Sequence, residues 1–164
     1  LRSISITDDL TGLLNRRGFF TLAQQQLKLA NRTRRGLMMV YADLDGLKTI
    51  NDVHGHGAGD RALLAMADIL RDLFRESDII ARLGGDEFSV LLTEDRGAGN
   101  EQTIRRRLRE AVDAWNGRTR EPFDLAVSVG VASYAPEQPG SLDRLVTQAD
   151  ELMYLDKKGK SARG

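Results

Sequence analysis

The sequence predicts an α+β fold in which helices pack on a mainly antiparallel central sheet. Short apolar runs typical of strands alternate with longer segments whose apolar residues recur at helical spacing. Two of the short runs are joined by adjacent glycines, as in a tight hairpin. The chain has 164 residues, 41% of them hydrophobic and 29% charged, which suits a single domain of ordinary globular composition.

The first half of the chain is expected to hold a helix, a strand and a second helix. Helical spacing of apolar residues places the first helix over residues 15–31. Residues 37–42 are almost continuously apolar and end at Asp43, which is typical of a strand covered on both faces. A glycine-rich connection over residues 55–59 then leads to an amphipathic helix over residues 60–74.

The second half is expected to hold three strands and two helices. In order, these are strands over residues 79–83 and 88–92, a helix over 101–115, a strand over 125–132 and a helix over 141–157. Ser141 is the predicted N-cap of the last helix. The order of elements is then close to β-α-α-β-β-α-β-α, for which helices on an antiparallel sheet are the natural architecture.

Charge and composition exclude several classes of function. Lys and Arg number 24 and Asp and Glu number 24, so the formal net charge is zero. This balance argues against a general nucleic-acid or membrane-surface binder, and an anionic ligand must be met by local charge. The absence of cysteine excludes disulfides and thiolate chemistry and fits a reducing, cytoplasmic compartment. Because the chain begins with Leu1 and not Met, we expect it to be a fragment of a longer protein.

Acidic residues follow two of the predicted strands. Asp43 and Asp45 end the buried strand, and Asp86 and Glu87 follow the two glycines of the hairpin. Alone, the first pair could be a polar strand end and the second a solvated turn. If the hairpin lies beside the first strand, however, Asp43 and Asp86 could share hard cations such as Mg²⁺.

A third polar feature runs from Asn51 to Asp60. Asp60 is the predicted N-cap of the helix that follows, whatever else it does. Asn51 and a carboxylate of this segment could also bind a guanine base, whose N1 and N2 offer two donors. The two histidines, His54 and His56, would each be ordinary loop or packing residues if they stood alone.

Together these motifs resemble those of the GGDEF family, the diguanylate cyclases of bacterial signalling. Residues 82–88 match the family signature, and residues 8–17 resemble its opening motif. Residues 43–60 match the second motif with its spacing intact, and residues 149–157 resemble the closing helix. The resemblance covers essentially the whole chain. We therefore expect residues 1–164 to form one such domain, the output domain of a longer signalling protein.

The resemblance implies a fold similar to nucleotidyl cyclases and polymerase palms, with a ferredoxin-like core. It also implies that two GTP molecules are joined into cyclic di-GMP with release of two pyrophosphates, each 3′-hydroxyl attacking the α-phosphate of the other nucleotide. A homodimer is then required, and Mg²⁺, or Mn²⁺ in its place, is the implied cation. No nucleic acid is an expected partner. The domain is expected to be cytoplasmic and to make no membrane contact itself, whether or not the parent protein is anchored.

The family's functional residues map onto this chain by position. The implied metal ligands are Asp43, the Leu44 carbonyl, Asp86 and Glu87. Asp86 is also the implied proton acceptor for the 3′-hydroxyl, and Glu87 is the second catalytic acid. The implied GTP contacts are Gly46, Leu47, Lys48 and Lys157 at the phosphates, Asn51 and Asp60 at the guanine, and His56 within the site.

Two positions depart from the family pattern. Leu47 stands where many members have an aromatic residue before the lysine. Lys160 and Ser161 stand where many members have a glycine–arginine pair that helps to hold phosphate. Lys158, Lys160 and Arg163 are candidates to replace that arginine, and the sequence does not decide among them.

Arg75 and Asp78 form an Arg-x-x-Asp pattern five residues before the first signature glycine. In the family this pattern marks a site where the product binds and inhibits. The resemblance implies that Arg75 binds guanine or phosphate and that Asp78 accepts from the guanine N1/N2 edge. One arginine of the run 105–107, with Arg106 as the candidate, would complete this site.

Two rival functions remain open. The chain could be a catalytically inactive receptor that binds cyclic di-GMP through the Arg-x-x-Asp site. It could also be a GTP-binding regulatory module that keeps Asn51 and Asp60 but makes no product. The presence of all three signature acids, Asp43, Asp86 and Glu87, favours the cyclase.

Overall fold

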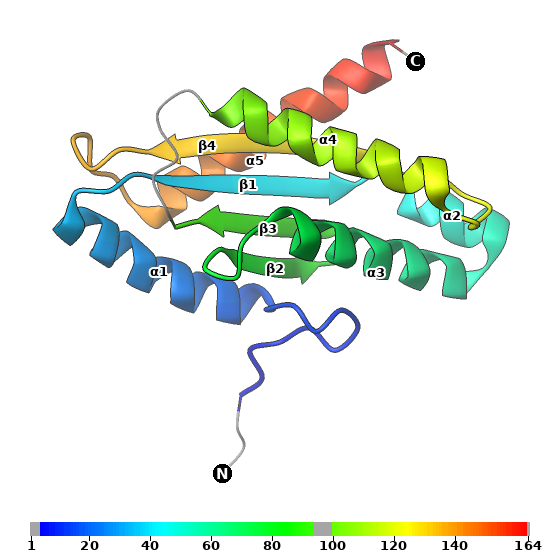
Figure 1. Cartoon of the computed structure of the whole chain (residues 1–164), viewed down its shortest axis with the longest axis horizontal. Helices are drawn as coiled ribbons and strands as arrows, with labels where there is room; N and C mark the ends of the chain where they lie inside the picture. The colour runs from blue at the N-terminus through cyan, green and yellow to red at the C-terminus, as the bar shows by residue number, and fades with distance from the viewer. Residues whose placement is uncertain (1–3, 94–99, 164) are drawn as a thin grey trace.

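A computed structural model describes residues 4–93 and 100–163, and in them helices cover both faces of an antiparallel sheet (Figure 1). The elements in chain order are α1 (Arg16–Thr33), β1 (Leu37–Leu44), α2 (Leu47–His54), α3 (His56–Leu73), β2 (Ile79–Gly84), β3 (Glu87–Leu92), α4 (Glu101–Arg118), β4 (Val127–Tyr134) and α5 (Leu142–Arg163). The helices and strands predicted by residue range are all present in this order, and α2 is an additional helix that no predicted range covers. The predicted α+β class with an antiparallel sheet is confirmed.

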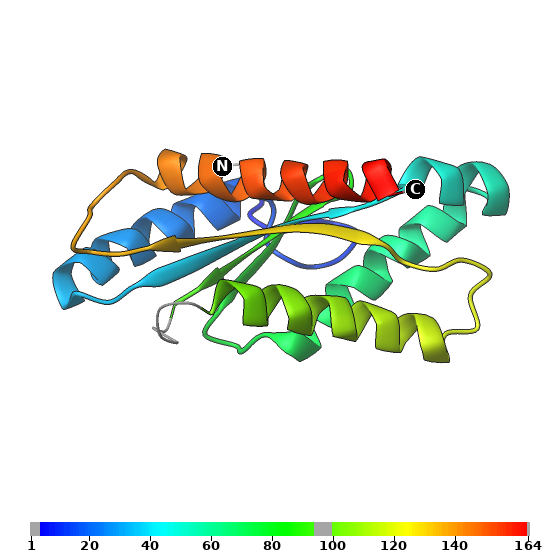
Figure 2. The same cartoon turned by 90° about the horizontal axis from the view of Figure 1, so that it is seen from above.

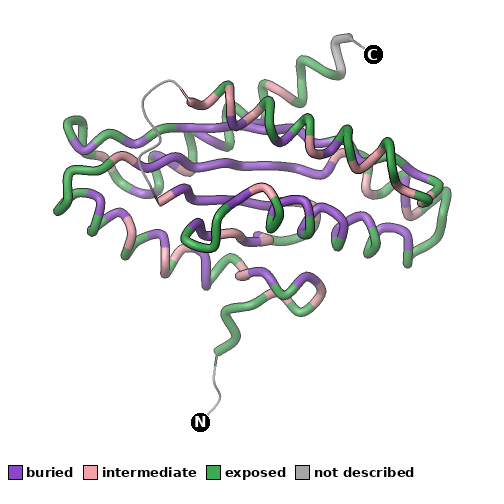
Figure 3. Tube along the Cα trace, viewed as in Figure 1, coloured by how far each residue is buried: buried purple, intermediate pink, exposed green. Residues whose placement is uncertain are grey.

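The sheet has the strand order β2-β3-β1-β4, with every neighbouring pair antiparallel. All eight residues of β1 are buried, which explains its almost continuously apolar sequence (Figure 3). Because β1 pairs with both β3 and β4, Asp43 lies opposite Glu87 on one side and Ser128 on the other. The Asp43 carboxylate, near the end of β1, therefore lies between β3 and β4.

Alternate residues of β1 enter two separate hydrophobic layers. Val40 and Leu44 belong to the layer shared with α3 and α4, and Met39 and Tyr41 to the layer shared with α1 and α5. Figure 2 shows the sheet between these two helical layers. The period of two along a strand produces this division.

The segment after β1 differs from its prediction. It contains the additional helix α2, and α3 begins at His56, so Asp60 lies inside α3 and the prediction that it is the N-cap is wrong. Gly55, with φ 92°, separates the two helices. Asn51 Oδ1 accepts the Gly59 N–H at 2.9 Å, which fixes this glycine-rich turn as helix.

Three further local predictions can be compared with the structure. The hairpin glycines are required, because Gly84 and Gly85 have φ of 146° and 51°. Ser141 is confirmed as the N-cap, since its Oγ accepts the Arg144 N–H at 3.1 Å. β4 begins two residues later than predicted, because Leu125 exchanges two 2.8 Å hydrogen bonds with the side chain of Asn116.

Among the helices of the described residues, none combines the length and apolar character that a membrane span needs.

Candidate functional site

The predicted meeting of the acidic strand ends is confirmed by strand register. The hairpin between β2 and β3 lies beside β1, and the Leu44 N–H donates to the Asp86 carbonyl at 2.8 Å. Asp43 and Glu87 are register partners across β1 and β3. Three carboxylates from two distant parts of the sequence therefore gather at one end of the sheet, where β1 ends and β3 begins.

Asp43 is the most buried of these acids, with 6% of the residue exposed. Its Oδ2 accepts a hydrogen bond from Lys157 Nζ at 2.6 Å, whereas its Oδ1 is buried without a hydrogen-bond partner in the described structure. Burial raises the pKa of Asp43, the Lys157 ammonium opposes that rise, and the adjacent Asp86 carboxyl adds to it. In turn, the hydrogen bond to Asp43 raises the pKa of Lys157.

Glu87 is likewise partly buried among other acidic residues. Burial raises its pKa, and the negative charges of Asp43 and Asp150 raise it further. The nearest guanidinium in an ion pair is that of Arg16, whose Nη2 lies 4.0 Å from Glu87 Oε2. A cavity of about 710 Å³ adjoins these acids, and α5 forms its wall with Tyr154 and Leu155 among others.

The carboxylate oxygens of this region suit a divalent cation that binds together with phosphate. Asp43 Oδ1 is a buried carboxylate oxygen with no donor, beside two further acids. In the part of the chain that the structure describes, no group of three or more Asp, Glu or His side chains is arranged so that it could hold a metal ion by itself. Mg²⁺ is commonly held by one or two carboxylates together with substrate phosphates, so a partial site is what this ion requires.

Two residues that the sequence did not single out hold the signature turn. The Arg82 guanidinium donates to the Gly85 carbonyl from Nε at 2.9 Å and from Nη2 at 2.8 Å, and its Nη1 donates to Asp8 Oδ1 at 3.0 Å. Burial would raise the pKa of Asp8, but hydrogen bonds from Thr11 and the Arg82 charge lower it overall. Both residues lie within motifs, yet 74 residues separate them, so only the fold reveals the pair.

The last turns of α5 bring cationic groups to the same end of the sheet. Lys160 Nζ lies 3.2 Å from Asp45 Oδ2 and also donates to the Val127 carbonyl. Lys158 instead lies over the ring of Tyr154, 5.0 Å from its centroid. The side chain of Arg163 lies outside the described residues. Of the two candidates whose side chains the structure describes, Lys158 and Lys160, it is Lys160 that lies beside an acid of this region, Asp45.

The residues predicted to hold GTP lie along α2 and the start of α3. Gly46 has φ 71° and turns the chain from β1 into α2, whose first residues are Leu47 and Lys48. The hydrogen bond from the Gly59 N–H to Asn51 draws Asn51 next to the first turns of α3, where His56 and Asp60 are both exposed.

The residues of the predicted product site lie at the end of α3 and on α4, which pack together. Arg75 is exposed, but Asp78 is only 6% exposed, and its oxygens accept the N–H groups of Arg75 at 3.0 Å and Thr93 at 3.4 Å. Asp78 therefore shapes the turn before β2. Arg106 is exposed, and its Nη1 lies 3.6 Å from Glu110 Oε1.

Comparison with known proteins gives a consistent result. The family model described as "Diguanylate cyclase, GGDEF domain" matches residues 5–163. Diguanylate cyclase DosC of Escherichia coli K12 is 35% identical over 153 residues, which are 92% of this chain and 33% of DosC. The chain therefore spans about a third of the length of that relative.

Solved structures agree with this match. The isolated GGDEF domain of TpbB from Pseudomonas aeruginosa superposes with a TM-score of 0.83 at 36% identity, covering 93% of this chain and 89% of that one. The GGDEF domain of DgcB from Caulobacter crescentus, solved in complex with c-di-GMP, gives a TM-score of 0.82 at 25% identity and covers 97% and 94% of the two chains. The predicted palm-like cyclase fold is confirmed by these neighbours.

Proposed function

The chain belongs to the GGDEF domain family of diguanylate cyclases, and on that premise we propose that it condenses two GTP molecules into cyclic di-GMP and releases two pyrophosphates. One observation carries the proposal: Asp43, Asp86 and Glu87 meet at the end of the central strand, with the Lys157 ammonium 2.6 Å from Asp43. Carboxylates that gather beside a cationic group suit phosphoryl transfer, in which the protein mainly positions charge.

The nucleotide is expected to lie along the start of α2 and α3. The N-terminus of α2, with Gly46, Leu47 and Lys48, offers free backbone N–H groups and a positive charge to phosphate oxygens. Lys157 and Lys160 approach the same edge from α5. Asn51 and Asp60 are proposed to bind the guanine, with His56 beside them; the Asn51–Gly59 hydrogen bond supports this, since it links the two helices.

A divalent cation, Mg²⁺ or in its place Mn²⁺, is proposed to be held by Asp43, the Leu44 carbonyl, Asp86 and Glu87. When bound, it would neutralise the triphosphate and favour the 3′-alkoxide. The chain's own contribution is to keep Asp43 desolvated and to place Asp86 at the turn. There Asp86 is proposed to accept the proton of the attacking 3′-hydroxyl.

The reaction needs two nucleotides that face each other, so we propose that two copies of the domain supply one nucleotide each. We also propose that the product inhibits at Arg75 and Arg106. The burial of Asp78 suggests for it a supporting role, in which it holds the Arg75 backbone.

The test is to incubate the purified protein with GTP and Mg²⁺ and to separate the nucleotides by chromatography. Cyclic di-GMP is expected from the wild type and not from Asp86→Asn. A dimeric protein that binds cyclic di-GMP without making it would be a receptor. A protein that binds GTP but yields no product would be a regulatory module.

A further inference from the structure

Asp156, an acidic residue of α5, has a mostly buried side chain where that helix meets the outer strand of the sheet. Its side chain is 9% exposed. Asp156 Oδ2 accepts the Val129 N–H at 2.8 Å, and its Oδ1 accepts from Arg105 Nη2 at 3.2 Å and from Arg109 Nη2. This one carboxylate of α5 thus contacts two other elements, β4 and α4.

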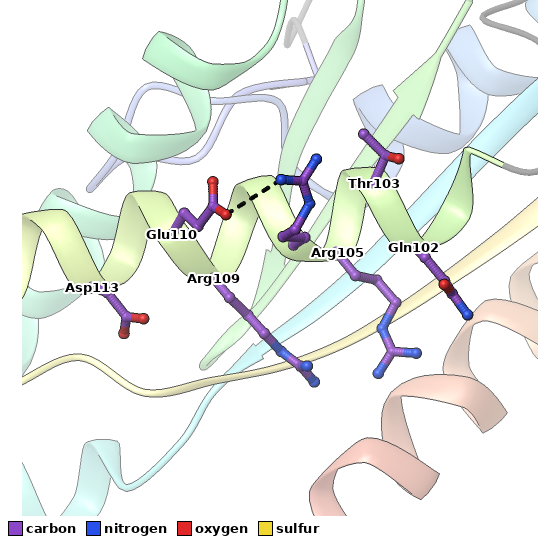
Figure 4. Close-up of a pocket in the computed structure, with 7 residues that line it drawn as sticks. Gln102, Thr103, Arg105, Arg109, Glu110 and Asp113 are labelled. Atoms are coloured by element: carbon purple, nitrogen blue, oxygen red, sulfur yellow. Dashed lines mark ion pairs between the residues drawn. The ribbon is translucent and has the colours of Figure 1, made fainter.

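These contacts join the two helical layers around the outer strand of the sheet, β4. β4 is an edge strand, with α4 in the layer on one face and α5 in the layer on the other (Figure 2). Arg105 and Arg109, one turn apart, extend side by side from α4 (Figure 4). Asp156 therefore binds α5 to the opposite layer by charge, where no sheet strand lies between them.

Lys160, one turn after Asp156, makes the matching contact, because its ammonium donates to the Val127 carbonyl. The end of α5 is thus fastened to β4 through one backbone donor and one backbone acceptor of that strand. Burial would raise the pKa of Asp156, but the Val129 N–H and the Arg109 guanidinium lower it overall, so the carboxylate is ionised at neutral pH.

The geometry points to Asp156 as a positioning residue for nucleotide phosphate, an inference that rests on the proposed function. Asp156 touches neither Asp43 nor Asp86 in these contacts, and it acts through its neighbour in sequence. By holding the end of α5 on β4 and α4, it sets where the Lys157 and Lys160 ammonium groups lie relative to Asp43 and Asp45.

The physical reason is the rigidity of a helix. Lys157 follows Asp156 directly, so any shift or rotation of the last turns of α5 moves Lys157 Nζ by a similar amount. A displacement of about 1 Å at a reacting group can cost on the order of 100-fold in rate or affinity. Stability alone does not require a carboxylate that faces two arginines and a strand edge so close to the proposed phosphate site.

The experiment compares Asp156→Ala, Asp156→Asn and a matched control, Glu101→Gln. Glu101 also joins α4 to β4, through Ser133 Oγ, and it is not among the residues of the proposed site. For each protein the KM for GTP, kcat, the affinity for GTP with Mg²⁺ by calorimetry and the thermal midpoint are measured. Arg109→Gln, which breaks the same contact from α4, covers the case in which an Asp156 variant fails to fold.

Asp156→Ala is expected to raise KM and the dissociation constant for GTP roughly tenfold, with kcat within about twofold of wild type. Asp156→Asn keeps an acceptor for the Val129 N–H and should show a smaller rise, Arg109→Gln a rise in the same direction, and Glu101→Gln none. An unchanged KM in folded Asp156→Ala or Arg109→Gln would overturn the inference, as would a fall in kcat alone.

Failure of the proposed function gives a different pattern. If the wild type binds GTP without making cyclic di-GMP, the cyclase proposal fails, and weaker GTP binding by Asp156→Ala would still support the positioning role. If the wild type does not bind GTP at all, Asp156 has no phosphate to position, and both proposals are overturned.

Discussion

The charged form of Asp43 lowers the stability of the folded chain, because Asp43 is buried beside Asp86 and only one of its oxygens accepts a hydrogen bond. Its raised pKa means that the folded chain binds a proton more tightly here than the unfolded chain does. This contribution therefore becomes destabilising as the pH rises above the ordinary value of 3.8. The sequence placed an acid at the strand end, but its burial and its missing donor depend on the tertiary structure.

We predict that Asp43→Asn becomes progressively more stable than the wild type as the pH rises from about 4 to 7. At low pH both side chains are neutral, so the two free energies of unfolding should converge. Urea unfolding at a series of pH values measures the difference. A difference that does not change with pH would show that Asp43 carries no such cost.

We predict that Asp86→Asn lowers the rate of cyclic di-GMP formation by about 10²–10⁴-fold, the usual contribution of a positioned general base. Its thermal midpoint should stay close to that of the wild type, because Asp86 is in the hairpin turn and is half-buried. Asp124→Asn, at an exposed acid of a loop, is the control and should leave the rate unchanged. A variant that keeps the wild-type rate would remove Asp86 from the mechanism.

Among the elements, the junction of α2 and α3 depends on one close contact. Gly59 packs against the Asn51 side chain, and a Cβ at position 59 would collide with the Asn51 amide. The glycines of this segment appeared to be a connection, because glycine usually weakens a helix. Gly57 and Gly59 are helical here, and glycine is needed at position 59 because the Asn51 side chain occupies the space of a Cβ and accepts the Gly59 N–H.

We predict that Gly59→Ala destabilises the domain by roughly 1–3 kcal/mol, since it overpacks the contact and displaces Asn51. It should also weaken GTP binding. Gly117→Ala, in α4 with open space around its Cβ, is the control and should instead stabilise by about 0.5–1 kcal/mol. Chemical unfolding and calorimetry with GTP measure both effects. Wild-type affinity in a destabilised Gly59→Ala would show that Asn51 does not bind the nucleotide.

The hairpin is a second element whose shape depends on a distant partner. Asp8 and Arg82 are mostly buried, with 18% and 16% of their side chains exposed. The Arg82 guanidinium donates a hydrogen bond to the Gly85 carbonyl of the turn. Because the pKa of Asp8 is lowered, its contribution to stability is present above the ordinary value of 3.8 and is lost as the pH falls below it.

We predict that Asp8→Ala costs about 1–3 kcal/mol of stability at pH 7 and lowers the cyclase rate, because the turn that carries Asp86 loses its support. The penalty in the free energy of unfolding should shrink at acidic pH, where Asp8 of the wild type is protonated. Asp9→Ala, at an exposed neighbouring acid, should show neither effect. A stable Asp8→Ala with a normal rate would contradict the supporting role.

For the whole molecule, the period of apolar residues was enough to predict the class of the fold and most of its helices. The meeting of Asp43 with the hairpin was predicted only on the condition that the hairpin lies beside the first strand. The period was not enough for contacts such as Asp8 with Arg82 or Asp156 with Arg105 and Arg109, which join residues 47 to 74 positions apart. Such pairs follow from the order of strands and the layering of helices, which local patterns do not contain.

At this scale the fold also shows where the acidic and basic residues that sum to a net charge of zero are placed. Acids gather at the ends of β1 and β3, where Lys157 of α5 meets Asp43, and Arg105 of α4 meets Asp156, so opposite charges are paired locally in a chain whose net charge is zero. The proposed site holds one nucleotide and one set of carboxylates. On the proposed function, a second copy brings the other GTP.

The most direct test of this account is the initial rate of cyclic di-GMP formation, with pyrophosphate measured in the same samples, as a function of protein concentration in GTP and Mg²⁺. The account predicts two pyrophosphates for each cyclic di-GMP, and a rate that rises with the square of protein concentration while monomers predominate. Pyrophosphate release without cyclic di-GMP, or no release at concentrations at which the protein is dimeric, would contradict it.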